Sequence, residues 1–393
     1  MTTERVSPDN GLRRPRVLLS AARLGDGGGR KSGNYYHVVH LVRALASRDD
    51  IDLVVLADDD SYDDLRTLVD DRSVVRASVG GSVVRRDLAL VRAVHRVRPD
   101  IFHKPTGALP TFPLPCRTIA GIADLNFTVL PTRVDKRIYK ELTHRWTVRT
   151  ADHITCVSEY TRHAVLSYLN ADPAAVSVIH HGTNELTGRD DGMGRELRST
   201  GGPYWLAFAQ HPHKNAETLF QVLAESRAQG GDGRLVLVGN APYVGDTLRP
   251  MVSALGLGDA VVFAGAVTSG TLRGLYEQSE GLLFPSSYEG FGLPILEAMA
   301  LGCPVIASNV CSLPEVAGDA AILVEPHDVR AILAGVRQLR SEARQAWITR
   351  GLARARLFTW QRAADETVAL YARLGPQVHR RDTALIPASR AVS

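Results

Sequence analysis

The sequence predicts an α/β fold made of two doubly wound domains, each a parallel sheet with helices on both faces. Short, almost continuous apolar runs alternate with segments of helical periodicity, and this alternation occurs twice along the chain. Strands without a regular polar alternation are typical of parallel sheets that are covered on both sides. Residues 185–203, rich in glycine and charge, separate the two series and are interpreted as a linker.

The first series opens with an apolar run at 16–22, followed by a glycine-rich loop at 25–33 and a helix at 34–47. Strand, glycine loop and helix in this order are the beginning of a βαβ unit. Further strands are predicted at 51–57, 100–104, 117–124, 153–158 and 176–182, and helices at 86–97, 133–150 and 159–169. The terminal segments 1–14 and 376–393 are expected to be disordered.

The second series follows the linker and predicts a domain over residues 204–357. Its strands are expected at 204–209, 234–240, 260–265, 281–286, 304–308 and 322–326. Its helices are expected at 215–229, 246–255, 270–279, 294–301 and 328–340. Ligands of such sheets bind beyond the carboxyl ends of the strands, so two sheets in tandem predict a cleft between the domains.

The composition is that of a globular protein. The chain has 393 residues, 45% of them hydrophobic and 22% charged, which excludes fibrous and low-complexity classes. A net charge of +4 is small for a nucleic-acid-binding protein, and no apolar run of 18 residues predicts a membrane span. The start of the chain lacks the apolar segment of a signal peptide, and the four cysteines form no CxxC pair, so a cytoplasmic location is expected.

Residues 284–309 carry the strongest chemical signal. Glu289 lies in a glycine-containing loop, while Pro294 and Gly302 mark the first turn and the end of a helix that contains Glu297. Between the two glutamates, four backbone amides are predicted to face a ligand at the helix start: those of Gly290, Phe291, Gly292 and Leu293. Two carboxylates suit hydroxyl groups, as on a sugar and a ribose, better than a phosphate. Acidic residues that merely favour a helix start are the alternative.

This segment resembles the E-x7-E region of retaining GT-B glycosyltransferases of family 4, with Glu289 and Glu297 as the two glutamates. Further colinear resemblances cover most of the chain, at 153–162, 263–290, 312–326 and 358–374. The resemblance implies two Rossmann-like domains facing across a cleft. Its expected boundaries are an acceptor-side domain at 15–184, a linker at 185–203, a donor-binding domain at 204–357 and, at 358–375, a helix that crosses back to the first domain.

The resemblance also implies roles for individual residues. Glu289 would contact the hydroxyls of the transferred sugar, Glu297 would hold the donor ribose, and the amides of 290–293 would face the diphosphate or the sugar. Lys214 matches the family lysine that neutralises the diphosphate. This role fits the chemistry, because the leaving group gains negative charge as the glycosidic bond breaks. Such donors are handled by cations and helix dipoles, so neither a cofactor nor a metal is expected.

Two positions depart from the family pattern. Phe208 stands where an arginine usually precedes the lysine; His211 or His213 is the candidate to replace it, and weaker binding of the donor phosphate is the alternative. Ala123 stands where many relatives have a histidine before Asp124, the expected acceptor-side residue.

Two further residues match family positions of the predicted first domain. His103 matches a family histidine at a strand end near the donor sugar, with a structural histidine as the alternative. Gly33 ends the loop that in this fold faces the diphosphate and the acceptor, with a flexible surface loop as the alternative.

Two other nucleotide or metal patterns are incomplete. The loop at 25–33 fails both the P-loop and the GxGxxG pattern, because Arg30 replaces a required glycine. An Asp-x-Asp pattern within 57–64 is typical of metal-binding GT-A enzymes, but nothing else in the chain resembles that fold.

The predicted helix at 133–149 has two distinct faces. One is basic and the other apolar, with Arg133, Arg137, Lys140 and His144 opposite Val134, Ile138, Leu142 and Trp146. The simpler interpretation is a core helix whose apolar stripe is buried. The alternative is docking to an anionic membrane surface or to a phosphate-bearing acceptor.

The sequence therefore predicts a transferase that moves a hexosyl group, such as mannosyl or glucosyl, from a UDP- or GDP-sugar to an acceptor hydroxyl. The family implies retention of configuration by front-face attack assisted by the leaving phosphate, which explains why no separate base is evident. The acceptor is a saccharide, a lipid-linked sugar or a small molecule, and nucleic acid is not an expected partner. A sugar-nucleotide epimerase of the same fold, an NAD-dependent oxidoreductase and a non-catalytic sugar-binding module are the alternatives.

Overall fold

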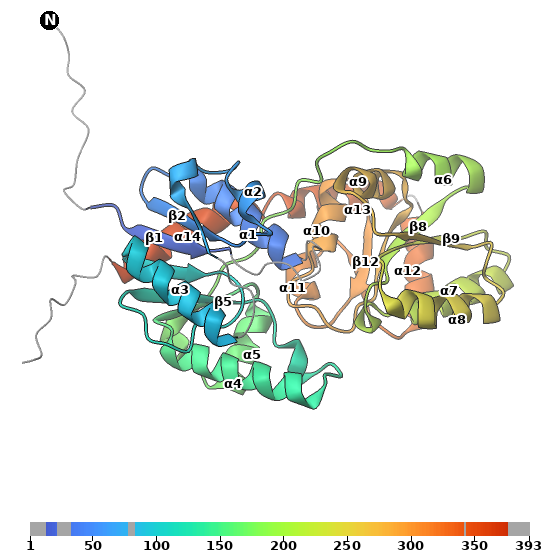
Figure 1. Ribbon diagram of the computed structural model, residues 1–393. Coiled ribbons are helices and arrows are strands. Elements are labelled where there is room, and N and C mark those ends of the chain that lie inside the picture. The colour runs from blue at the N-terminus through green and yellow to red at the C-terminus, as the bar shows by residue number, and fades with distance from the viewer. Residues whose placement is uncertain (1–12, 22–32, 78–82, 342, 376–393) are drawn as a thin grey trace, which may run out of the picture. The chain divides into compact units, whose positions relative to one another are not determined.

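The computed structural model describes residues 13–21, 33–77, 83–341 and 343–375, and its strands form two sheets (Figure 1). The first sheet has seven strands in the order β3-β2-β1-β4-β5-β6-β7, and the second has six in the order β10-β9-β8-β11-β12-β13. Neighbouring strands pair in parallel, as β1 does with β2 and β4, and β8 with β9 and β11. The predicted fold class, two doubly wound α/β domains, is confirmed.

The strands and helices of the first series alternate along the chain. Its strands are β1 (Arg16–Ser20), β2 (Asp52–Ala57), β3 (Val74–Arg76), β4 (Ile101–Lys104), β5 (Arg117–Ile122), β6 (His153–Cys156) and β7 (Val176–Val178). Its helices are α1 (Gly33–Ala46), α2 (Tyr62–Leu65), α3 (Val83–Val97), α4 (Val134–Thr150) and α5 (Glu159–Leu169). Most agree with the predicted ranges, but β7 is shorter than the strand expected at 176–182.

The second series is laid out in the same way. Its strands are β8 (Tyr204–Phe208), β9 (Arg234–Val238), β10 (Val261–Gly265), β11 (Gly281–Phe284), β12 (Val305–Ser308) and β13 (Ile322–Val324). Its helices are α6 (Met193–Gly201), α7 (Ala216–Ala228), α8 (Arg249–Ala254), α9 (Ser269–Gln278), α10 (Leu293–Ala300), α11 (Leu313–Ala317), α12 (Val329–Leu339), α13 (Arg344–Ala355) and α14 (Trp360–Leu374).

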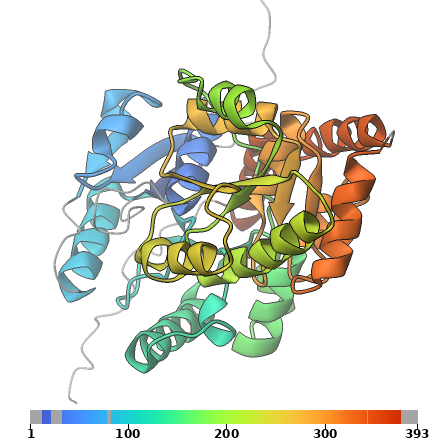
Figure 2. The ribbon, with the colours of Figure 1, turned by 90° about the vertical axis from the view of Figure 1, so that its right-hand side faces the viewer.

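The second sheet is buried on both faces, as near-continuous apolar strands predict. Along β8, Leu206 belongs to a core shared with α9 and α10, whereas Trp205 belongs to a core shared with α7, α8 and α12. Figures 1 and 2 show α6 and α9 on one side of this sheet and α7 and α8 on the other. A helix layer on each side leaves the carboxyl edge of the strands as the place for a ligand.

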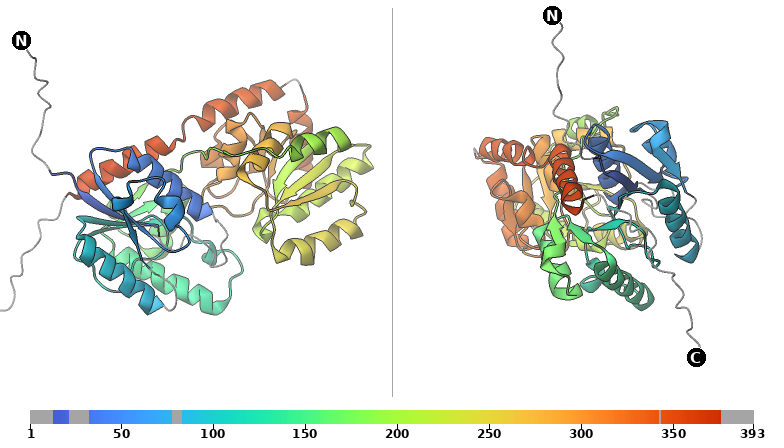
Figure 3. Two further views of the ribbon diagram at one scale, coloured as in Figure 1. Left: turned by 45° about the horizontal axis from the view of Figure 1, so that its top comes forward. Right: turned by 90° about the vertical axis from the view of Figure 1, so that its left-hand side faces the viewer.

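The backbone contacts divide the chain into two compact units. One contains residues 1–120, 150–153 and 365–393, and the other contains 121–149 and 154–364. The end of α14 therefore belongs to the first unit, where Arg48 pairs with Asp365 at 2.5 Å and Tyr371 is fully buried (Figures 1 and 3). The domain boundaries expected from the sequence stay a prediction.

Helix α6 lies within residues 185–203, the segment interpreted from the sequence as a linker, where no helix was predicted. Met193 and Leu197, four residues apart, face the same side of the helix and pack against the core of the second sheet. Two apolar positions among many glycines and charges gave too weak a periodicity for prediction.

Helix α4 contradicts the simpler expectation for its apolar stripe. Val134, Ile138 and Leu142 are exposed by 73%, 53% and 63%, and Trp146 by 39%. The buried side of the helix contains Thr147 instead. Among the residues that the structure describes, no helix is long and apolar enough to cross a membrane.

Candidate functional site

The site is built around the loop that joins β11 to α10. The chain leaves β11 at Phe284, passes through Glu289 and enters α10 at Leu293, with Pro294 in the first turn. Pro lacks the N–H that would be unsatisfied there, so it favours a helix start at this point. Glu297 then lies inside α10, as the sequence predicted.

Glycine is required at two positions of this loop. A side chain on Gly290 would place its Cβ 2.3 Å from the carbonyl oxygen of Ala123 and 3.0 Å from the Cβ of Asp124. Gly292 has φ of 115°, a conformation that L side chains rarely adopt, and it is the N-cap residue of α10. Ala123, which departs from the family pattern, thus lies directly against Gly290.

Lys214 and Glu289 form an ion pair at the carboxyl ends of two neighbouring strands. The Lys214 Nζ lies 2.6 Å from the Glu289 Oε1, and the side chains are only 11% and 14% exposed. Lys214 follows β8 and Glu289 follows β11, and these strands are hydrogen-bonded to each other. The parallel pairing therefore brings together a cation and a carboxylate that are 75 residues apart.

The turn that holds Lys214 is fixed by its neighbour Asn215. Asn215 adopts a left-handed conformation with φ of 59°, and its buried amide donates to the carbonyl oxygens of Pro285 at 3.1 Å and Pro326 at 2.6 Å. Ser287 N–H donates to the carbonyl oxygen of His213 at 2.8 Å, which joins the same two loops. Lys214 is thus held by backbone contacts on both sides.

His213, predicted as a donor-binding residue, lies in this turn beside Lys214. Its ring stacks on that of His211, with centroids 5.3 Å apart. Burial and the neighbouring Lys214 lower the pKa of His213 to about 4. His213 is therefore neutral near pH 7 and offers a hydrogen bond rather than the charge of the missing arginine.

Glu297 is buried and hydrogen-bonded on both carboxylate oxygens. Asn184 Nδ2 donates to Oε1 at 2.8 Å, and the Tyr276 hydroxyl donates to Oε2 at 3.3 Å. Burial raises the pKa of Glu297, and the bonds from Asn184 and Tyr276 and the charge of Lys214 offset this only in part. The carboxylate is held in one orientation, which suits a fixed set of hydroxyl donors on a ligand.

Three buried polar atoms near this edge have no hydrogen-bond partner among the described residues. They are Asn184 Oδ1, Gln210 Oε1 and Ser286 Oγ. Gln210 follows β8 and Ser286 follows β11, so both lie just past the carboxyl ends of neighbouring strands. Because buried polar groups are normally paired, such atoms indicate a place where a polar ligand binds.

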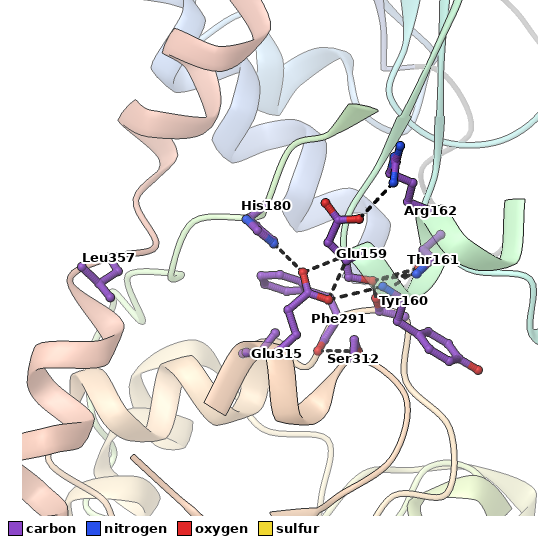
Figure 4. Close-up of polar contacts among 12 residues, drawn as sticks. Glu159, Tyr160, Thr161, Arg162, His180, Phe291, Ser312, Glu315 and Leu357 are labelled. Atoms are coloured by element: carbon purple, nitrogen blue, oxygen red, sulfur yellow. Dashed lines mark hydrogen bonds and ion pairs between the residues drawn. The ribbon is translucent and has the colours of Figure 1, made fainter. Parts of the chain in front are cut away.

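Three hydroxyl groups hold the glycine loop from outside. Ser158 Oγ donates to the carbonyl oxygen of Gly290 at 2.7 Å, and Thr161 Oγ1 lies 3.3 Å from the same oxygen. Ser312 Oγ donates to the carbonyl oxygen of Glu289 at 3.0 Å and to that of Phe291 at 2.7 Å. Figure 4 shows Ser312 beside Phe291. These bonds fix the carbonyl groups of the loop.

Glu315 joins α11 to the first turn of α5. Its carboxylate accepts hydrogen bonds from the N–H groups of Glu159 at 2.9 Å and Tyr160 at 3.3 Å, and from His180 Nε2 at 2.6 Å (Figure 4). Burial alone would raise the pKa of Glu315, but the bonds from His180, Glu159 and Tyr160 outweigh it and lower the pKa. Ser158, the N-cap of α5, is thereby held against Gly290.

Asp124 lies beside the glycine loop and near positive charge. Its Oδ1 accepts a hydrogen bond from the N–H of Asn126 at 2.9 Å, and Lys140 Nζ donates to Asn126 Oδ1 at 3.1 Å. Burial raises the pKa of Asp124, although the Asn126 bond and the charges of Lys140 and His144 act against it. The negative charge of Glu289 also raises the pKa of Asp124.

His103 lies in the first unit, on β4, where it is 2% exposed. Its Nδ1 lies 2.7 Å from the Tyr371 hydroxyl, and its Nε2 has no partner among the residues described. Burial, with a small contribution from His37, lowers the pKa of His103 to about 3. The ring is therefore neutral near pH 7.

The remaining sequence-based candidates have different outcomes. Gly33 is the first residue of α1, but the loop at 25–32 lies outside the described residues. Asp58 of the Asp-x-Asp segment is buried and accepts a hydrogen bond from the Ser61 N–H at 3.0 Å, as at a tight turn. Within the described ranges, no cluster of three or more His, Cys, Asp or Glu is arranged for a metal.

Sequence reasoning missed the residues that orient the site. Asn184 and Tyr276 hold Glu297, Ser158 and Ser312 hold the glycine loop, and Glu315 holds the first turn of α5. The only local signal was that Ser158 precedes a helix, which is typical of an N-cap. Their partners lie far away in the sequence, so no spacing rule could have identified them.

Comparison with known proteins shows the family of this chain. The family model described as "Glycosyl transferases group 1" matches residues 208–354, and that of "Glycosyltransferase Family 4" matches residues 35–185. The O-antigen chain mannosyltransferase B of Escherichia coli is 30% identical over 367 residues, which cover 85% of this chain and 94% of the relative. The MMP alpha-(1->4)-mannosyltransferase of Mycolicibacterium hassiacum is 35% identical, over 42% of this chain and 41% of its own.

Solved structures share the fold. The sucrose-phosphate synthase of Thermosynechococcus elongatus superimposes with a TM-score of 0.74 at 21% identity, over 92% of this chain and 99% of its own. HepE of Anabaena, solved in complex with UDP and glucose, gives a TM-score of 0.71 at 18% identity, over 91% of this chain and 100% of its own. The chain is therefore a glycosyltransferase, and it belongs to the group 1 glycosyltransferases of family 4.

Proposed function

We propose that the chain transfers a hexosyl group from a nucleotide-diphosphate sugar to an acceptor hydroxyl, with retention of configuration. The observation that carries the proposal is the Lys214–Glu289 pair beside the glycine loop of α10. Its cation suits the diphosphate, its carboxylate suits sugar hydroxyls, and the amides of 290–293 add hydrogen-bond donors at a helix start.

The transfer exchanges one C1–O bond for another on the same face of the sugar. The bond from C1 to the leaving diphosphate breaks as the bond to the acceptor oxygen forms, and the acceptor proton passes to a leaving phosphate oxygen. Lys214 balances the charge that grows on that phosphate, and Glu289 orients the sugar. The role of His103 near the donor sugar, implied by the resemblance, remains a proposal; its ring is neutral near pH 7, and its Nε2 has no partner among the described residues.

The nucleoside is proposed to bind along the carboxyl edge of the second sheet. Glu297 would accept from two ribose hydroxyls, and the adjoining Asn184 Oδ1 would accept a further hydrogen bond. Gln210 and Ser286, whose buried atoms have no partner among the described residues, would contact the diphosphate or the base. A ribose with both hydroxyls fits UDP or GDP, and mannose is the first sugar to test because the two relatives named above are mannosyltransferases.

The acceptor is proposed to bind near Asp124, beside Gly290. Free saccharides, lipid-linked sugars and small molecules remain the acceptor classes. A peripheral membrane contact through residues 133–149 and a cytoplasmic location are parts of the same proposal.

The test is a panel of UDP- and GDP-sugars with the full-length protein, scored for released nucleoside diphosphate and for the fate of the sugar. One donor should be hydrolysed slowly without an acceptor, and Glu289→Gln and Lys214→Met should abolish this release. An epimerised donor recovered without any nucleotide release would replace the transferase with an isomerase. Equal release by either variant would overturn the assigned roles.

A further inference from the structure

A carboxylate and a carboxamide, those of Asp124 and Asn126, adjoin the glycine loop. A Cβ on Gly290 would lie 3.0 Å from the Cβ of Asp124, and Gly290 directly follows Glu289, the residue proposed to hold the transferred sugar. The side chains of Asp124 and Asn126 are both half-buried. Asn126 therefore lies two residues from a group that borders the site, and neither the sequence nor the proposed function gives it a role.

The segment 123–126 is held in place by hydrogen bonds to its backbone. The Leu125 N–H donates to the hydroxyl of the buried Tyr288 at 3.1 Å. The Thr161 hydroxyl donates to the carbonyl oxygen of Ala123 at 3.2 Å. Because these contacts fix the segment before a ligand arrives, its polar side chains can bind one without a large loss of conformational freedom.

Lys140, on α4, determines which way the Asn126 carboxamide faces. Its Nζ donates to Asn126 Oδ1 at 3.1 Å, and it lies 5.9 Å from the centre of the buried Phe127 ring. A carboxamide has one acceptor oxygen and one donor nitrogen, so an ammonium on the oxygen leaves the nitrogen on the other side. Among the described residues, Asn126 Nδ2 donates no hydrogen bond. Its two hydrogens are available to a ligand.

Asp124 supplies an acceptor next to this donor. Its Oδ1 accepts the backbone N–H of Asn126 at 2.9 Å, which makes the two side chains neighbours. Its Oδ2 accepts no hydrogen bond from any residue that the structure describes. An available acceptor beside an available donor matches two neighbouring hydroxyls of a sugar ring, because a hydroxyl can donate its hydrogen or accept on its oxygen.

We propose that Asp124 and Asn126 bind two neighbouring hydroxyls of a saccharide acceptor, and that Lys140 is the positioning residue for Asn126. Asp124 Oδ2 accepts from one hydroxyl, Asn126 Nδ2 donates to the oxygen of the next, and a third hydroxyl of the same sugar attacks. This inference rests on the proposed function and narrows its acceptors to those that present a sugar ring. An acceptor without these hydroxyls would leave polar groups of the site unpaired, which disfavours its binding.

The experiment uses the full-length protein, the donor that the nucleotide-sugar panel identifies, and simple probes of the acceptor site. The probes are the methyl α-glycosides of mannose, glucose and galactose, which present adjoining hydroxyls in different orientations, and ethanol, which has one hydroxyl. The measured quantity is the amount of hexosyl group transferred to each probe, divided by the amount released to water at the same probe concentration. At least one glycoside should capture the hexosyl group better than ethanol does. Equal capture by ethanol and all three glycosides would overturn the inference.

Asn126→Leu removes the donor and keeps a side chain of similar shape. It should lower the preference for the glycoside over ethanol about tenfold, as expected for the loss of one hydrogen bond at a partly buried site. Lys140→Met should lower the same preference, because the carboxamide can then turn over, and Lys140→Arg should restore it. Lys136→Met is the matched control, because Lys136 is an exposed lysine one turn earlier on α4, and it should keep the preference.

Donor hydrolysis without any probe reports the proposed function by itself, and it should be the same in every variant. A glycoside preference that Asn126→Leu retains would overturn the inference. Donor hydrolysis that falls in parallel with glycoside capture would also overturn it, because the Asn126 carboxamide would then support the structure of the site instead of binding the acceptor. A preference that survives Lys140→Met would contradict the positioning role of Lys140.

Discussion

The ammonium of Lys214 lies 2.6 Å from the carboxylate of Glu289, although 75 residues separate them in the chain. Each side chain is nearly buried, and the Phe284 ring lies 4.8 Å from the Lys214 Nζ. A charge pair in such surroundings interacts more strongly than one in water, and each member needs the other. An anionic diphosphate would bind the same ammonium. Lys214 could then pair with the diphosphate in place of the Glu289 carboxylate.

The pair should therefore act as a unit in transfer. Lys214→Met and Glu289→Gln are each expected to lower kcat by about 10²–10³-fold, the usual loss when one group that stabilises the transition state is removed. The double variant should lose much less than the product of the two, because the groups share one function. Arg227→Met, which breaks the exposed Arg227–Asp259 pair, is the control and should leave kcat unchanged. Fully multiplicative losses would contradict the coupling.

Glu297 should make stability depend on pH. Burial raises its pKa above 4.5, so the folded state holds the proton more tightly than the unfolded state does. Its contribution is therefore most favourable below the unfolded pKa and is lost as pH rises through the folded pKa. Calorimetry of Glu297→Gln should show the Tm of the variant rising relative to that of the unchanged protein as the pH is raised above 4.5.

Glu297→Gln should lower the affinity for the donor nucleotide, although it raises the relative Tm. UDP or GDP binding by Glu297→Gln should weaken roughly tenfold to hundredfold, about 1–3 kcal/mol for lost bonds to a charged group. Glu277→Gln, at an exposed carboxylate on α9, should change neither quantity. If the Tm difference between Glu297→Gln and the unchanged protein did not vary with pH, burial would not shift the pKa of Glu297.

Gly290→Ala should disrupt the site through backbone contact alone. The new Cβ would lie 2.3 Å from the Ala123 carbonyl oxygen, so the loop must move away from the Asp124 segment. Overpacking of this kind lowers the free energy of unfolding by about 1–3 kcal/mol. The fractional loss of donor hydrolysis should be larger than the fractional loss of folding stability. Gly258→Ala is the control, because nothing lies within 4 Å of its Cβ position. Urea unfolding and nucleotide release measure the two effects, and full activity of Gly290→Ala would contradict the close approach.

Glu315→Gln should weaken the first turn of α5. Because hydrogen bonds from His180, Glu159 and Tyr160 outweigh burial and lower its pKa, Glu315 stabilises the fold above the unfolded pKa of 4.5, and this stabilisation is lost as pH falls through the folded pKa. At pH 7 the variant should lose about 1–2 kcal/mol in urea unfolding, as for a removed helix cap. Glu159→Gln, at a mostly exposed neighbour, is the control. A loss that persists below both pKa values would contradict this sign.

His103 should remain neutral over the working pH range. Burial lowers its pKa to about 3, so the folded state binds the proton less readily than the unfolded state, and stability falls as pH drops below 6.5. NMR should show one imidazole, absent in His103→Gln, that does not titrate between about pH 5 and 8. An imidazole assigned to His103 that titrates in that interval would contradict the burial.

The sequence predicted what is local in this protein. Apolar runs and helical periodicity placed most strands and helices within a few residues of their bounds. Strands that are buried on both faces have apolar residues at consecutive positions, and this pattern is visible in the sequence. The glycines, Pro294 and the glutamate spacing located the loop and α10, because helix starts have their own chemistry. Helix α6 was not predicted, because two apolar residues among glycines and charged residues are too few for a periodic signal.

The tertiary structure alone decided which groups meet and which face outward. Asn184 reaches Glu297 across 113 residues and Glu159 reaches Glu315 across 156, and such contacts depend on strand order and helix packing. The apolar stripe of α4 looked like a core face in the sequence and is exposed in the fold. Periodicity shows that a helix has an apolar face, but only the packing of its neighbours determines whether that face is covered.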